Sequence, residues 1–120
     1  MIKVLIADDS SFMREVIKDI LEKQDDIEVV GEAENGDTAV AKYRELDPDV
    51  VTLDIVMPDS NGINALEKIL KINSNAVAIM ITSIGQEKYV KQCLDMGAKG
   101  FIIKPFAEED VLETIRMSVS

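Results

Sequence analysis

The chain has no histidine, no tryptophan and a single cysteine, Cys93, among its 120 residues. Without histidine it cannot form a Ser-His-Asp triad, a histidine-ligated zinc site or a phosphohistidine of its own. Any histidine that takes part in its chemistry must therefore come from a partner. One cysteine excludes an internal disulfide and a thiolate metal cage, and it suits a reducing compartment, so we expect a cytoplasmic protein.

Basic charge and long apolar segments are also scarce. Lys and Arg number 13 against 23 Asp and Glu, a formal net charge of −10, whereas a nucleic-acid-binding protein needs a basic face. No apolar run approaches the roughly 18 residues of a membrane span. The apolar start at residues 2–7 runs directly into two acids, unlike a signal peptide. We expect no nucleic-acid or membrane partner, and a monomeric single domain over residues 1–120.

Strand and helix patterns alternate along the whole chain. Short apolar runs predict strands at 3–7, 28–33, 50–54, 76–82 and 100–104. Apolar residues at three-to-four spacing predict a helix after each strand, with stripes over 12–21, 39–46, 63–70, 86–96 and 111–119. Ser10 or Ser11 is the expected N-cap of the first helix. The strand at 28–33 is more polar and belongs at an edge, whereas the other four suit strands buried on both faces. Five such units predict an α/β fold with a parallel sheet between helices.

Polar residues stand where four of these strands end. In parallel sheets the ligand lies outside the carboxyl ends of the strands. If the four strands are neighbours, three carboxylates, two hydroxyls and one ammonium converge at one edge of the sheet. The residues are Asp8, Asp9, Asp54, Thr82, Ser83 and Lys104.

Each of these residues alone has an ordinary structural explanation. The acids could favour a helix dipole or form a turn, and the lysine could be a counter-ion. Their joint occurrence at four strand ends favours a site. Clustered carboxylates repel one another and need a cation, and Mg²⁺ suits a few carboxylates together with a phosphate oxygen. The chain has no glycine-rich loop after its first strand, so neither a nucleoside triphosphatase nor a dinucleotide-binding protein is supported.

Several segments together resemble one protein family. They are Asp8-Asp9, the run 53–58 followed by Asn61-Gly62, Thr82-Ser83, and the run 97–101 that leads to Lys104-Pro105-Phe106. In this order, over the whole chain, the sequence resembles the receiver domain of bacterial and archaeal two-component response regulators. Residues 9–14 are similar to the chemotaxis branch, which comprises the CheY-like proteins and the receiver of chemotaxis methylesterases. The resemblance implies a (βα)5 doubly wound, flavodoxin/CheY-like fold with strand order 2-1-3-4-5.

The resemblance also implies a role for each site residue. Asp54 would be the phosphoacceptor that takes a phosphoryl group from a histidine kinase. Asp9, Asp54 and the Val56 backbone carbonyl would bind Mg²⁺, or Mn²⁺ in its place, with Asp8 acting through water. Thr82, Ser83 and Lys104 would bind the phosphoryl group, and Thr82 and Phe101 would form the switch. The Lys104–Pro105 bond would be cis, against a base rate of about 5–6%.

The family further implies partners and alternatives. A changed surface of the fourth helix, fifth strand and fifth helix would bind a flagellar or archaellar motor adaptor, and a phosphatase would be a further partner. The domain would catalyse only its own phosphorylation and dephosphorylation. A receiver from a larger methylesterase or transcription factor, or a phosphorelay intermediate, stays open. Two departures stand out: Phe101 lacks a tyrosine hydroxyl, and the apolar Val56 and Ile84 predict a long-lived phosphoryl group.

Overall fold

A computed structural model describes residues 1–58 and 61–120; Asp59 and Ser60, in the expected loop at 57–62, lie outside the described residues. Strands and helices alternate throughout. The elements are β1 Ile2–Ala7, α1 Ser11–Glu22, β2 Ile27–Ala33, α2 Gly36–Leu46, β3 Val50–Leu53, α3 Gly62–Ile72, β4 Ala78–Thr82, α4 Glu87–Met96, β5 Gly100–Ile103 and α5 Glu108–Val119. Within the described ranges, no helix has the length and apolar character needed to cross a membrane.

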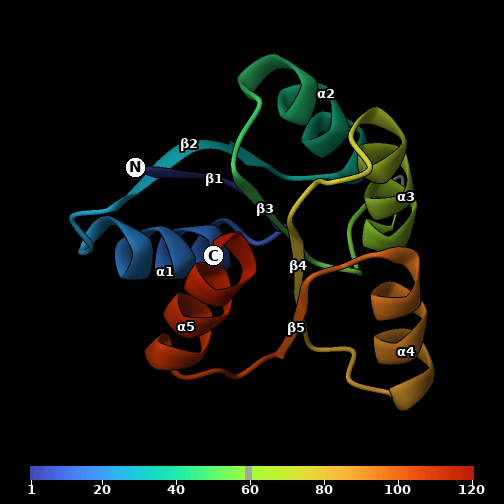
Figure 1. The fold of residues 1–120 in the computed structure, drawn as a ribbon. Helices are drawn as coiled ribbons and strands as arrows, with labels where there is room; N and C mark the ends of the chain where they lie inside the picture. Colours follow the sequence, from blue (N-terminus) through green and yellow to red (C-terminus); the bar gives the residue numbers. More distant parts are fainter. Residues whose placement is uncertain (59–60) are drawn as a thin grey trace.

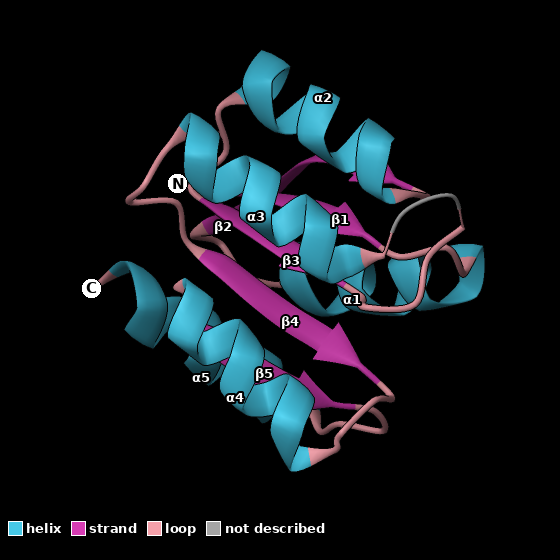
Figure 2. Ribbon diagram, turned by 90° about the vertical axis from the view of Figure 1, so that its right-hand side faces the viewer, coloured by secondary structure: helices cyan, strands magenta, loops and turns pink. Residues whose placement is uncertain are grey.

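The five strands form one parallel sheet in the order β2-β1-β3-β4-β5, which confirms the expected topology. Ala7 of β1 pairs with Leu53 of β3, and Leu53 pairs in turn with Met80 of β4. This register aligns the carboxyl ends of the three central strands (Figure 2). The loops that leave those ends therefore lie next to one another, as a site at this edge of the sheet requires.

The sheet separates two apolar cores. Helices α1 and α5 cover one face, and α2, α3 and α4 cover the other (Figure 1). Ile17, Ile115 and Ile81 belong to the first core, while Leu66 and Cys93 belong to the second. Each fully buried aliphatic side chain contributes about 1.5–3 kcal/mol, so this double packing holds the strand ends rigidly in place.

Side-chain caps fix the start of three helices. The Ser10 hydroxyl accepts a hydrogen bond from the Met13 amide and so caps α1. Asn35 caps α2 by accepting from the Thr38 amide. Asn61 caps α3 in the same way. Each cap satisfies an amide that would otherwise lack a partner. Since these caps sit in the loops after β1, β2 and β3, they also order the edge where the polar residues gather.

Two expectations about burial are wrong. Phe12, assigned to the apolar stripe of the first helix, is 74% exposed, because the first turn of α1 lies beyond the C-terminal end of β1 and no strand covers it. The fifth strand is not buried on both faces: it forms the second edge of the sheet, and of its four residues Ile102 alone is buried. Its residue Ile103 is 47% exposed. Both residues are therefore available at the surface.

Candidate functional site

Three carboxylates meet where β1 and β3 end. Asp8, Asp9 and Asp54 each offer a carboxylate oxygen, and these oxygens lie within 4.8 Å of one another. Asp8 and Asp54 are buried, whereas Asp9 is exposed. The main chains are joined as well, since the Asp54 amide donates to the Ala7 carbonyl at 3.1 Å. The expected convergence of the acids is therefore present in the fold.

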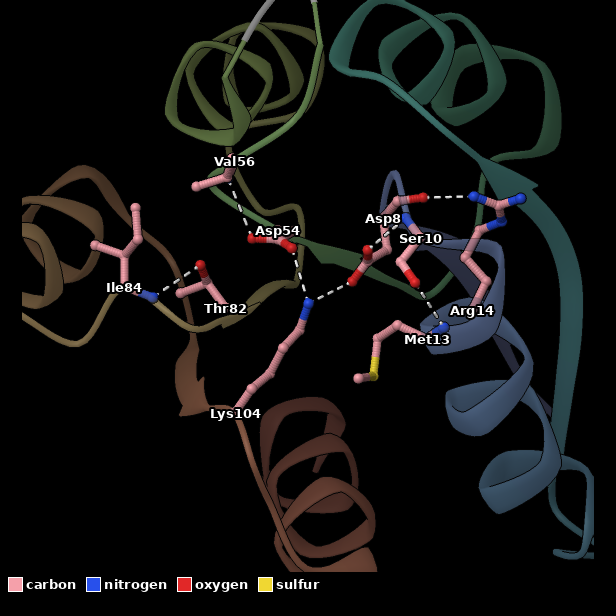
Figure 3. A network of polar contacts seen from close by, with 9 residues as sticks. All are labelled: Asp8, Ser10, Met13, Arg14, Asp54, Val56, Thr82, Ile84 and Lys104. Atoms are coloured by element: carbon pink, nitrogen blue, oxygen red, sulfur yellow. Dashed lines mark hydrogen bonds and ion pairs between the residues drawn. The ribbon is translucent and has the colours of Figure 1, made fainter.

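Lys104 places its ammonium group between the two buried acids. Its Nζ lies 2.7 Å from Asp8 Oδ2 and 2.8 Å from Asp54 Oδ2, and Figure 3 shows the lysine reaching up from the end of β5 to both carboxylates. Its backbone amide donates to the Thr82 carbonyl, which ties this loop to β4. The Lys104–Pro105 peptide bond is cis. The lysine thus acts as a tethered positive charge inside the acidic cluster.

Each buried carboxylate divides its two oxygens between the lysine and a backbone amide. The other oxygen of Asp8 accepts from the Ser10 amide at 2.9 Å, and that of Asp54 accepts from the Val56 amide at 3.1 Å. Charge-assisted bonds of this kind are stronger than neutral ones. Both side chains are consequently held in one orientation from the main chain as well as from Lys104.

Burial and pairing act in opposite directions on the charged groups. Burial raises the pKa of Asp8, and the hydrogen bond from Lys104 opposes this increase without cancelling it. For Lys104, burial lowers the pKa, but the hydrogen bonds to Asp54 and Asp8 outweigh it, so the pKa of the ammonium is raised. The folded site therefore favours the protonated ammonium of Lys104 and disfavours the ionised form of the Asp8 carboxyl group.

The start of α3 lies so close to the backbone of Asp54 that position 62 requires glycine. The Gly62 amide donates to the Ile55 carbonyl at 2.8 Å. A Cβ atom on Gly62 would lie 1.9 Å from the Asp54 carbonyl oxygen, well inside any allowed contact. The absence of a side chain at Gly62 lets the start of α3 lie directly on the backbone of Asp54.

The remaining predicted residues surround the site at β4 and β5. Thr82 is completely buried, and its hydroxyl oxygen accepts a hydrogen bond from the Ile84 amide at 3.3 Å. Ser83 is exposed next to it. Phe101 is half-buried against the core under α2, α3 and α4. It lies on β5, whose register opposes Phe101 to Met80 of β4, two residues before Thr82.

Sequence reasoning missed two contacts of this site. The structural alternative for Lys104, a counter-ion, did not include Asp8, whereas the ammonium bonds both Asp54 and Asp8. Sequence reasoning also assigned no role to Arg14, whose guanidinium bonds the Asp8 carbonyl. A basic residue in the first turn of an amphipathic helix is usually a solvated side chain, so no pattern in the chain distinguished this one.

The donor atoms fit a hard divalent cation. Carboxylate oxygens from three acids are the ligands that Mg²⁺ and Mn²⁺ prefer, and such ions also keep several waters and bind phosphate oxygens. A cluster of acidic residues at a surface is by itself weak evidence for a metal site. Here two of the three are buried and lie against an ammonium that already compensates part of their charge. The site is therefore suited to a further cation and an incoming anion together.

Comparison with known proteins gives the same family throughout. The model of the response regulator receiver domain matches residues 4–116. The chemotaxis protein CheY of Thermotoga maritima is 50% identical over 113 residues, which cover 94% of this chain and 93% of that protein. The response regulator domain of Thermotoga maritima CheB has a TM-score of 0.93 at 42% identity, covering 99% of this chain and 96% of that one.

A third relative was solved in a complex. The CheX–CheY–BeF3–Mg²⁺ complex from Borrelia burgdorferi gives a TM-score of 0.93 at 38% identity, over 98% of this chain and 89% of that chain. Identity near 50% to several CheY proteins is consistent with a phosphoacceptor switch in chemotaxis. The chain belongs to the response regulator receiver domain family.

Proposed function

We propose that this protein is a signalling switch in which Asp54 accepts a phosphoryl group from the phosphohistidine of a partner kinase. The supporting observation is the buried Asp54 carboxylate at the end of β3, grouped with Asp8 and Asp9 and bonded to Lys104. Since these 120 residues contain no histidine, the donor histidine lies outside them. Carboxylates are established nucleophiles in aspartyl-phosphate chemistry.

The metal site consists of residues at the ends of two adjacent strands. Asp9, Asp54 and the Val56 carbonyl would hold Mg²⁺, or Mn²⁺ in its place, and Asp8 would contribute through a water molecule. A bound divalent ion neutralises the charge that develops on the phosphoryl oxygens. Asp8 and Asp54 are already oriented by the Ser10 and Val56 amides, so binding requires little rearrangement of these side chains.

In the transfer step an oxygen of Asp54 forms a bond to phosphorus. The phosphorus–nitrogen bond of the phosphohistidine breaks, and the imidazole leaves with the bonding electrons. Lys104 exchanges its contact with Asp54 Oδ2 for a phosphoryl oxygen, while Thr82 and Ser83 donate to another. The domain in this proposal catalyses only its own phosphorylation and the later hydrolysis by water.

The phosphoryl group then changes the balance between two conformations. It adds one to three charge-assisted hydrogen bonds, each worth about 1.5–3 kcal/mol, enough to reverse an equilibrium of a few kcal/mol. Thr82 moves toward the phosphoryl group, and Phe101 fills the space that the threonine leaves. The surface formed by α4, β5 and α5 is altered as a result, and it binds a flagellar or archaellar motor adaptor.

The cellular setting follows from the same relatives. We propose a monomeric, cytoplasmic receiver over residues 1–120, with a histidine kinase as donor and a phosphatase as a further partner. The complex of a related CheY with CheX, BeF3 and Mg²⁺ supports recognition by a second protein while the site is loaded. The 41% identity to a protein-glutamate methylesterase/protein-glutamine glutaminase of Clostridium acetobutylicum, over 37% of that protein, keeps a role within a larger regulator as the alternative.

Mass spectrometry of the intact protein tests the phosphoacceptor. Incubation with acetyl phosphate and Mg²⁺ should add one phosphoryl group to the wild type and none to Asp54→Ala. Asp95→Ala, at an exposed helical position, is the matched control and should be modified like the wild type. A phosphoryl group on Asp54→Ala, or equal modification in EDTA, would contradict the proposal.

Fluorine NMR tests the switch directly. The chain has three phenylalanines, so uniform fluorophenylalanine labelling gives three assignable signals. Adding beryllofluoride and Mg²⁺ should shift the Phe101 signal in the wild type. The Thr82→Ala protein should bind the same reagent and leave this signal in place. If the reagent moved the Phe101 signal of Thr82→Ala as far as it moves that of the wild type, the coupling of the two residues would be refuted.

A further inference from the structure

Arg14 connects the metal-site loop to the neighbouring strand β2. Its side chain is 15% exposed, and its guanidinium makes two directed contacts. Nη1 donates to the Asp8 carbonyl oxygen at 2.6 Å, and Nε donates to Glu32 Oε1 at 3.0 Å. Figure 3 shows the Asp8 carbonyl pointing toward Arg14, away from the side where the Asp8 carboxylate meets Lys104.

These contacts fix the peptide group between Asp8 and Asp9. The Asp8 amide donates to the Ala33 carbonyl of β2 at 3.0 Å, and the Asp8 carbonyl accepts from Arg14. Both backbone groups of Asp8 are therefore held from the β2 side. A peptide group is planar, so a fixed Asp8 carbonyl also fixes the direction in which the chain enters Asp9.

Asp9 depends on its backbone for its orientation. Its side chain is exposed, and in the ranges 1–58 and 61–120 no hydrogen bond or ion pair holds its carboxylate. Yet one of its oxygens lies within 4.8 Å of oxygens of Asp8 and Asp54. Asp8 and Asp54 are oriented by backbone amides and by Lys104. The orientation of the Asp9 carboxylate must instead come from the backbone that carries it.

We propose that Arg14 is a positioning residue for the metal site: through the Asp8 carbonyl it orients the Asp8–Asp9 peptide group so that the Asp9 carboxylate faces Asp54. The inference rests on the metal site of the proposed function. Groups beyond the ligands commonly orient them, and their loss typically costs about 10–100-fold in metal affinity. Arg14 acts on a ligand through the main chain and does not itself contact the metal.

Glu32 is the anchor of the guanidinium. Its carboxylate also lies 3.9 Å from the Lys18 ammonium, and its carbonyl accepts from Lys42. An open hollow of about 230 Å³ borders the guanidinium, with Glu32, Thr38 and Lys42 among its lining residues. Because open space lies beside the guanidinium, its two hydrogen bonds rather than close packing define its position. The rigid fork of arginine spans both acceptors, which a single ammonium does less well.

Positioning and charge predict opposite effects on cation binding. Arg14 carries a positive charge near the site, so its removal by electrostatics alone should tighten the binding of a dication. If the residue positions Asp9, its removal should weaken that binding. The sign of the change therefore distinguishes the two roles, and a general loss of stability would appear separately in unfolding measurements.

Manganese titration followed by EPR of the free ion provides the test, with the full chain at fixed ionic strength. Arg14→Met, which keeps much of the stem and loses the donors, should bind Mn²⁺ about tenfold more weakly than the wild type. Arg14→Lys keeps the charge and should lose a smaller part of the affinity. Lys18→Met is the matched control, because Lys18 also contacts Glu32 but has no contact with Asp8, and it should bind Mn²⁺ as the wild type does. Urea unfolding of each protein verifies that it is folded at the titration temperature.

The outcomes separate this inference from the proposed function. Wild-type or tighter affinity in Arg14→Met overturns the positioning role and leaves the metal site standing. If Arg14→Met does not fold, wild-type affinity in Arg14→Lys has the same meaning. Equal losses in Arg14→Met and Lys18→Met also overturn it, since the effect would then come from Glu32 and not from the Asp8 carbonyl. No Mn²⁺ binding by the wild type would remove the metal site itself.

Discussion

Replacing Lys104 by methionine should expose how the acidic cluster is stabilised. The variant leaves Asp8 and Asp54, whose side chains are 2% and 7% exposed, without their shared counter-ion. Removing one partner of a buried ion pair typically costs about 3–5 kcal/mol. Two carboxylate charges 4.8 Å apart, the outer limit for these acids, repel by about 3.5 kcal/mol at an effective dielectric constant of about 20. This repulsion is present in the wild type as well, where the ammonium offsets it, so the expected loss is that of an unpaired buried ion, about 3–5 kcal/mol.

The loss should depend on pH and on Mg²⁺. Without the ammonium, the pKa of Asp8, already raised by burial, rises further above its unfolded value of 3.8. Between these two pKa values the folded state binds more protons, so stability falls as pH rises through this window. The deficit of the variant should therefore shrink as pH is lowered from 7. At ten times its dissociation constant from the variant, Mg²⁺ should raise the stability of the variant by about 1.4 kcal/mol over its value in EDTA.

Urea unfolding followed by circular dichroism measures these terms in EDTA and in Mg²⁺. The exposed Lys99 provides the control, because Lys99→Met should change the free energy of unfolding by less than about 0.5 kcal/mol. A loss below about 1 kcal/mol for Lys104→Met at pH 7 in EDTA would refute the reasoning. So would a deficit that is the same at pH 5 as at pH 7.

Three further predictions concern the loops around the acceptor and the alkaline limit. Apolar side chains at Val56 and Ile84 should hinder an attacking water, so acyl phosphate decay followed by intact mass should be slower in the wild type than in Val56→Asn, Ile84→Glu. Gly62→Ala forces a methyl group against the Asp54 backbone, and we expect urea unfolding to show a loss of about 1–3 kcal/mol or more; a smaller loss would mean that α3 can shift freely. Because the pKa of Lys104 is raised above 10.5, its stabilisation is fully present below that pH and lost as pH rises through the folded value. As pH is raised from 7, the stability difference between wild type and Lys104→Met should therefore narrow only in strongly alkaline solution, and narrowing between pH 7 and pH 9 would contradict this assignment.

The architecture was predictable because each element carries its own local signal. Continuous apolar runs at β1, β3 and β4 indicated central strands, and the polar residues after them indicated the functional edge. Strand β5 was misjudged because the apolar Phe101 and Ile102 have the composition of a buried strand, although the fifth position in the order leaves one side of β5 without a neighbour. Phe12 was misjudged because helical periodicity says nothing about how far the sheet extends beneath a helix.

The site was predictable as a set of residue types, and less so as a set of contacts. Topology brings Asp8 and Lys104 together across 96 positions of sequence, and no local pattern encodes that pairing. The link from Arg14 to the Asp8 carbonyl uses a backbone acceptor. Every residue type has such a carbonyl, so the sequence does not mark this one. Contacts of these two kinds emerge only from the packed fold.

The completely buried Cys93 gives the molecule an internal probe of local opening. Burial raises the pKa of its thiol, so an alkylating reagent has little thiolate to attack while α4 stays docked. Because no second cysteine competes, the labelling rate would report the frequency with which this part of the chain opens. Any signal that loosens or tightens α4 would thus be recorded chemically, without an added fluorophore.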